Sequence, residues 1–131
     1  MDDNNREQVQ PSPQVVPFSV DTLKNSQTLH IRQEIYERIL MNAFPPTRKD
    51  LDDLKNAIAN DDFEVIQRVA HRLKGVFYNL RIEKLGMVAE QMNEIAKAGN
   101  SKANKERIGT LREEFSLYFC QLERMFITKE H

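Results

Sequence analysis

The sequence predicts an all-α protein that folds as an antiparallel up-and-down four-helix bundle with an additional N-terminal helix. Between about residues 28 and 127, apolar residues recur at steps of three and four, the spacing of one helix face. No stretch alternates apolar and polar residues with the period of a β-strand. The connections between the periodic stretches are short, which favours antiparallel neighbours.

The N-terminal 27 residues are polar and contain three of the five prolines, so we expect a flexible leader or an interdomain linker. We expect the helical bundle to span residues 28–127 and a short tail to span residues 128–131. Its first helix should begin near Thr28 and end at Phe44, because proline at 45 and 46 disfavours helix continuation.

The remaining helices are expected from their caps and apolar faces. Thr47 is a candidate cap for the second helix, with Asp50 three residues later, and this helix should run to about Ile58. The acidic break at residues 60–62 should cap a helix that extends to about Leu80. Two further helices are expected at about 82–97 and 102–127, separated by a turn at 98–101.

Composition excludes several classes of function. A net charge of −1 gives no strong field for nucleic acid or an anionic membrane. A single cysteine allows no internal disulfide and no cysteine-based zinc site, and no calcium-loop spacing is present. No apolar run approaches the ~20 residues of a membrane span, and the N-terminus lacks a signal-peptide pattern. We therefore expect a cytoplasmic chain, or the cytoplasmic piece of a larger membrane protein.

The helix expected at about 61–80 carries the most informative residues. Its apolar side chains define one face, from which His71 points about 135° away at 100° per residue. Lys74 and Gly75 lie one turn further along, on the histidine's side. A glycine inside a helix costs about 1 kcal/mol relative to alanine, and packing within the core does not explain one on the exposed side.

These three residues together indicate a reversible phosphoryl acceptor. Imidazole is largely neutral at cytosolic pH and is then nucleophilic. The Lys74 ammonium could offset the charge of a phosphoryl group on His71 through a charge-assisted hydrogen bond. The missing side chain at Gly75 would leave room over the imidazole for the active site of a partner.

The run from His71 to Gly75, with Val69 and Ala70 before it and Leu80 after it, closely resembles the histidine-containing phosphotransfer (HPt) domains of bacterial phosphorelays. The resemblance covers about residues 29–127. It implies a four-helix domain without a kinase site or bound nucleotide, whose histidine shuttles a phosphoryl group between receiver-domain aspartates.

The resemblance also implies roles for particular residues and partners. His71 would be the phosphoacceptor, Lys74 its charge partner and Gly75 the clearance residue. The partners would be the receiver domains of a hybrid sensor kinase and of a response regulator. No cofactor is implied, because the magnesium ion of such a transfer belongs to the receiver. We expect a monomer.

The sequence departs from the family pattern in two ways. Val76 and Phe77 stand where small residues are usual, and Arg81 stands where glycine is common. The stretch 71–77 is most similar to the Rcs-type phosphotransfer proteins of enteric bacteria, in which this domain is the C-terminal piece of a membrane-anchored protein. That similarity would make residues 1–27 an interdomain linker.

The surroundings of His71 provide further candidates. Asn93, on the following helix, matches a polar amide that approaches the histidine ring in related domains, and it could hold the imidazole tautomer. Other polar or small residues near the histidine are candidates for contact with a receiver: Gln67, Arg68, Arg72, Tyr78, Gly86 and Glu90. For each one, an ordinary solvated surface residue is the alternative.

A different class of function remains open. A helical adaptor could bind a receiver domain without being phosphorylated, with Gly75 serving close approach alone. The sequence predicts no autonomous kinase, since it offers one candidate centre and no glycine-rich phosphate loop.

Overall fold

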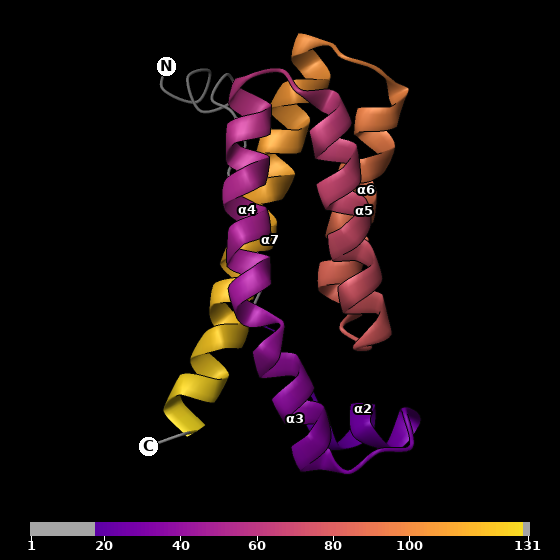
Figure 1. The fold of residues 1–131 in the computed structure, drawn as a ribbon, viewed down its shortest axis with the longest axis vertical. Helices are drawn as coiled ribbons and strands as arrows, with labels where there is room; N and C mark the ends of the chain where they lie inside the picture. The colour runs from indigo at the N-terminus through magenta and orange to yellow at the C-terminus, as the bar shows by residue number, and fades with distance from the viewer. Residues whose placement is uncertain (1–17, 130–131) are drawn as a thin grey trace, which may run out of the picture.

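The computed structural model describes residues 18–129, and every regular element in this range is a helix (Figure 1). The prediction of an all-α fold is confirmed. The six helices are α2 (Thr22–Thr28), α3 (Gln33–Asn42), α4 (Phe44–Ala59), α5 (Phe63–Asn79), α6 (Glu83–Ala98) and α7 (Lys102–Lys129).

Helices α4 to α7 form the predicted four-helix bundle. In Figure 1, α4 and α7 run together along one side and α5 and α6 along the other. Contacts join α4 to α5, α5 to α6, α6 to α7 and α7 back to α4, which closes the ring around one core. Phe77 belongs to this core, with its ring centroid 5.6 Å from that of Phe115 and 6.4 Å from that of Phe119. Both ring contacts are edge-on, and Phe77 is completely buried, as its position in the sequence pattern predicted.

The connections on either side of α5 are tight and alike. Asp61 and Arg81 have left-handed φ angles of 56° and 62°. In each turn the next amide donates to the carbonyl five residues back, from Asp62 to Ala57 and from Ile82 to Phe77. Glycine adopts this conformation without strain, so the glycine common in the HPt family at the position of Arg81 has a physical reason.

The start of α5 follows the predicted cap. The Asp62 side chain accepts a hydrogen bond from the Val65 amide at 3.3 Å. This bond satisfies one of the unpaired amides of the first turn. It fixes where α5 begins and therefore which of its residues face the core.

The expectation of a flexible leader over residues 1–27 is wrong for residues 22–27, which belong to α2. Asp21 caps this helix by accepting from the Lys24 amide at 2.9 Å. Thr22 is buried, and its hydroxyl donates to Glu37 of α3 at 2.7 Å. Polar contacts with α3 therefore stabilise a helix that has no apolar stripe. Residues 1–17 lie outside the described residues.

The first predicted helix, 28–44, is also interrupted. His30 has a φ of 59°, and the chain turns there between α2 and α3. The additional N-terminal element is therefore two short helices. Tyr36 of α3 ties them to the bundle, because its hydroxyl donates to the Leu80 carbonyl and accepts from the side-chain amide of Asn25. Burial raises the pKa of Tyr36 and keeps this phenol protonated as a donor.

The expected cap at Thr47 is wrong as well. The cap of α4 is Ala43, and prolines 45 and 46 lie in the first helical turn. Amides in that turn have no acceptor within the helix, so proline begins the helix instead of separating two helices. Thr47 is buried inside α4.

At the C-terminus, α7 extends to Lys129, so the tail expected from residue 128 begins at least two residues later. Residues 130–131 are outside the described range. Within residues 18–129, no helix combines the length and the apolar character needed to cross a membrane.

Candidate functional site

His71 lies near the middle of α5 and is exposed, while its neighbours Ala70 and Leu73 are completely buried. The amphipathic pattern of α5 therefore directs the imidazole away from the core, as predicted. Among the residues that the structure describes, none forms a hydrogen bond or ion pair with this ring. The imidazole is available to a partner molecule.

Gly75, one turn after His71, is exposed and has open space around it. A Cβ added at this position would meet no heavy atom within 4 Å. The folded chain itself therefore does not require glycine here. Open space of this kind fits the predicted clearance for a partner.

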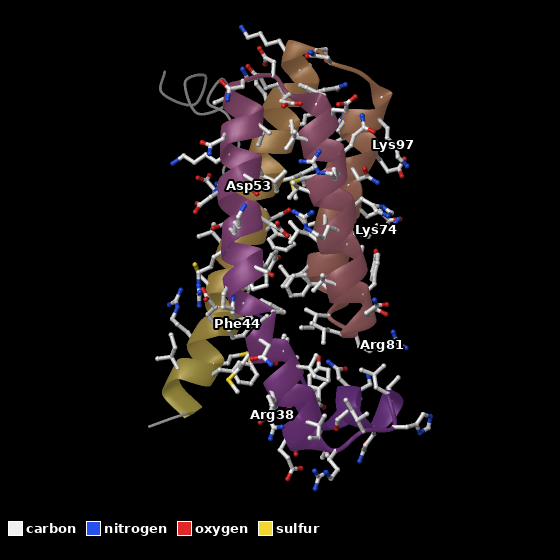
Figure 2. All side chains as sticks on the ribbon, in the orientation of Figure 1. Arg38, Phe44, Asp53, Lys74, Arg81 and Lys97 are labelled. Carbon is white, nitrogen blue, oxygen red and sulfur yellow. The ribbon has the colours of Figure 1, made fainter. Side chains whose placement is uncertain are left out.

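Lys74 and Tyr78 lie toward α6 and share one carboxylate there. The Lys74 ammonium is 3.7 Å from Glu90, and the Tyr78 hydroxyl donates to Glu90 at 2.7 Å. This hydrogen bond raises the pKa of Tyr78, because it favours the protonated phenol that donates it. In Figure 2, Lys74 projects from the middle of α5.

Gly86 of α6 lies directly beneath the Tyr78 ring. A Cβ at this position would be 2.6 Å from the nearest ring carbon. Gly86 is thus required by a contact within the chain, whereas the sequence suggested contact with a receiver. Because Gly86 has no Cβ, the Tyr78 ring can lie against α6, and its hydroxyl then reaches Glu90.

Asn93 lies across from His71 by the register of the two helices. Helices α5 and α6 are antiparallel, and Lys74 faces Glu90. His71 lies three residues before Lys74 on α5, and Asn93 lies three residues after Glu90 on α6. The antiparallel register therefore sets His71 opposite Asn93. Asn93 is only 2% exposed, and its side-chain amide makes no hydrogen bond with the described part of the chain. The amide is therefore free to hydrogen-bond to a group at the histidine.

Arg72 faces α4. Its guanidinium donates to both carboxylate oxygens of Asp50, at 2.5 and 3.2 Å, and Asp50 is 6% exposed. These hydrogen bonds raise the pKa of Arg72. Arg72, which the sequence placed among docking residues, thus joins α4 to α5.

Asp50 was missed as a partner of Arg72, since the sequence pattern suggested a capping role. A signal was present, because Asp50 lies four residues before Leu54, on the apolar face of α4. A carboxylate at an inward position of a helix needs a cationic partner. Of the other two docking candidates, Gln67 is half-buried and Arg68 exposed, and neither forms a hydrogen bond or ion pair with described residues.

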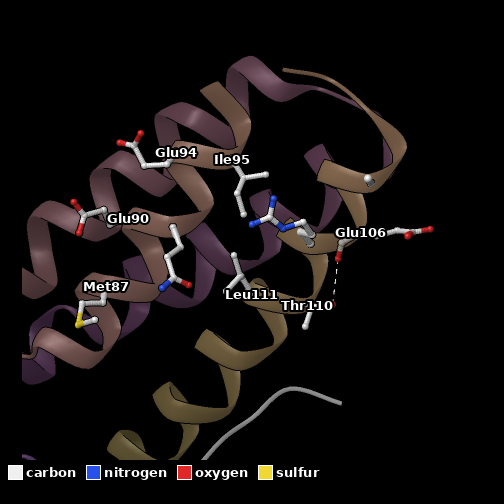
Figure 3. Close-up of a pocket in the computed structure, with 10 residues that line it drawn as sticks. Met87, Glu90, Glu94, Ile95, Glu106, Thr110 and Leu111 are labelled. Atoms are coloured by element: carbon white, nitrogen blue, oxygen red, sulfur yellow. Dashed lines mark hydrogen bonds between the residues drawn. The ribbon is translucent and has the colours of Figure 1, made fainter. Parts of the chain in front are cut away.

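A mainly apolar groove lies between α6 and α7 (Figure 3). Ile95 and Leu111 line it from the two helices, and Met87, Glu90 and Glu94 border it along α6. His71 does not line this groove. Glu90 therefore stands between the groove and the side chains that surround the histidine.

The sequence model of the Hpt domain matches residues 40–119, which cover α4 to α6 and most of α7. Curated proteins and solved structures give no significant match. The matched range contains His71, Lys74, Gly75 and Asn93. Hpt domains take part in histidine phosphotransfer within phosphorelays and interact with receiver domains. The exposed histidine on a four-helix bundle and the match over most of the chain agree, and this chain belongs to the Hpt domain family.

Proposed function

We propose that His71 accepts a phosphoryl group from a phospho-aspartate of one receiver domain and passes it to an aspartate of another. One observation above all supports this proposal. His71 is exposed, without a partner among the described residues, beside open space at Gly75 in an Hpt domain. An exposed imidazole on a convex helix face can enter the active site of a partner.

Each of the two transfers, to His71 and then from it, is one nucleophilic displacement at phosphorus. The lone pair of a ring nitrogen of neutral His71 attacks the phosphorus, and a nitrogen–phosphorus bond forms. The bond from phosphorus to the aspartyl oxygen breaks, and the aspartate leaves as a carboxylate with the bonding electrons. The proton on the other ring nitrogen stays on the ring or passes to water. In the second transfer a carboxylate oxygen attacks, and the electron pair returns to the imidazole.

Lys74 and Asn93 would assist His71 in different ways. The ammonium of Lys74 offsets the charge of the bound phosphoryl group. The Asn93 amide fixes one tautomer of the imidazole and so keeps a lone pair directed outward. We expect the magnesium ion of this reaction on the receiver domain.

The finer assignments rest on the sequence alone. We propose a cytoplasmic monomer that works between the receiver domains of a hybrid sensor kinase and of a response regulator. Similarity of residues 71–77 to the Rcs-type proteins supports membership in that subgroup, as the cytoplasmic part of a membrane-anchored protein.

The proposal is tested by incubation with a receiver domain that carries a radiolabelled aspartyl phosphate. We expect label on this chain that is labile in acid and stable in base, as a phosphoramidate is. Binding of the receiver without any labelling would reject the proposal and favour the alternative, an adaptor that is not phosphorylated.

A further inference from the structure

We propose that Glu90 is a positioning residue that holds Lys74 back from His71 and thereby keeps the phosphohistidine ready to give up its phosphoryl group. This inference rests on the proposed function. It changes the role of Glu90, Tyr78 and Gly86 from contact with a partner to control of the site itself.

The first support is a continuous chain of contacts from Gly86 to Lys74. The Tyr78 ring lies against Gly86, where no Cβ would fit. The Tyr78 hydroxyl donates to Glu90 at 2.7 Å, and Glu90 is 3.7 Å from the Lys74 ammonium. The phenol thus fixes the carboxylate, and the carboxylate attracts the lysine.

The second support is the looseness of the last contact. At 3.7 Å the ammonium and carboxylate attract each other by charge, but they are beyond the usual length of a hydrogen bond. The side chains of Lys74 and Glu90 are 30% and 43% exposed. An exposed pair of this kind contributes little stability and can exchange partners.

The third support is the charge at the site. A phosphoryl group on His71 is one helical turn from Lys74, and its negative charge competes with Glu90 for the same ammonium. Glu90 therefore opposes phosphorylation, since part of the lysine's charge stays neutralised. Replacing this carboxylate by an amide of the same shape releases Lys74 to the phosphoryl group.

The experiment measures how phosphoryl groups partition at equilibrium between one receiver domain and this chain. Glu90→Gln should shift the distribution toward His71 by about three- to tenfold, as expected for one charge removed near an exposed dianion. Tyr78→Phe should shift it in the same direction but less, because Glu90 loses its hydrogen bond.

Glu94→Gln is the matched control. Glu94 lies one turn further along α6, is exposed and borders the same groove (Figure 3), but forms no ion pair with described residues. A general effect of charge, or of a partner in the groove, would appear in both variants. The control should shift the partition by less than about twofold, since Glu94 holds no cation among the described residues and exposed charges are screened by salt.

A second background tests whether Glu90 acts through Lys74. In the Lys74→Ala variant, Glu90→Gln should shift the partition no more than Glu94→Gln does, because the ammonium that Glu90 holds is absent. Equal shifts for Glu90→Gln with and without Lys74 would overturn the inference. So would a partition unchanged by Glu90→Gln while the wild-type chain is phosphorylated. A wild-type chain that accepts no phosphoryl group would instead overturn the proposed function.

Discussion

Two ion pairs flank His71, and they differ in geometry and in the burial of the carboxylate. Arg72 makes two hydrogen bonds to Asp50, a carboxylate buried between α4 and α5. Lys74 is 3.7 Å from Glu90, and both side chains reach solvent. A planar guanidinium with two hydrogen bonds to a buried carboxylate is fixed, whereas an ammonium with no hydrogen bond to its exposed carboxylate can move. Cations two residues apart on one helix can therefore serve different purposes, Arg72 the fold and Lys74 the site.

The largest expected effect lies at the residue between the two pairs. His71→Gln should reduce phosphoryl transfer by about a hundredfold or more, since no nucleophile remains at the site. Helix content and melting temperature should stay unchanged because the side chain is exposed. His30→Asn is a suitable control, since His30 is also exposed and asparagine tolerates its φ of 59°. Equal loss in both variants would contradict the assignment.

Lys74→Ala breaks the loose pair. We expect transfer to His71, or the lifetime of the phosphorylated form, to fall by about tenfold, because a charge-assisted hydrogen bond to the phosphoryl group is lost. The free energy of unfolding should change by less than about 0.5 kcal/mol, as for other exposed pairs. Single-turnover transfer and urea unfolding measure the two quantities. Full activity would remove the charge-partner role from Lys74.

Arg72→Ala breaks the tight pair, and the opposite pattern is expected. The variant leaves the Asp50 carboxylate buried without its partner, which should lower the free energy of unfolding by about 1–2 kcal/mol. Transfer by the folded fraction should remain within about twofold of the wild type. Arg68→Ala, an exposed arginine one turn earlier, is the control for stability. Loss of transfer at unchanged stability would make Arg72 a docking residue after all.

Gly75→Ala should stabilise the fold and separates the needs of the fold from those of the complex. Alanine should raise the free energy of unfolding by about 0.5–1 kcal/mol, because nothing in the chain blocks its Cβ. Transfer should slow by severalfold if a receiver approaches closely over this residue. Gly109→Ala on α7 also has open space and should stabilise without slowing transfer. Unchanged transfer in both variants would mean that Gly75 provides no clearance.

The bundle helices were predictable because their apolar residues recur at helical spacing, and α5, α6 and α7 lie within two residues of their expected bounds. Helix α2 was not predictable in this way. Leu23 is its single large apolar residue and is 51% exposed, so the helix depends on contacts with α3. The prolines before Thr47 were misinterpreted because proline both ends one helix and begins another.

The site was predictable in part for a similar reason. The exposure of His71 and Gly75 follows from the period of one helix. The contacts of Tyr78 with Gly86 and Glu90 depend on how α5 and α6 align, and the pairing of Arg72 with Asp50 depends on α4. Sequence patterns within one helix do not contain that alignment. The sequence therefore indicated which residues lie near His71, but it did not indicate their contacts within the chain.

The most direct test of phosphoryl transfer to His71 is mass spectrometry of this chain after incubation with a phosphorylated receiver domain, kept at alkaline pH to preserve phosphohistidine. We expect the mass of one added phosphoryl group, located on the peptide that contains His71. A phosphoryl group on another residue would contradict it, as would an unmodified chain that still binds the receiver.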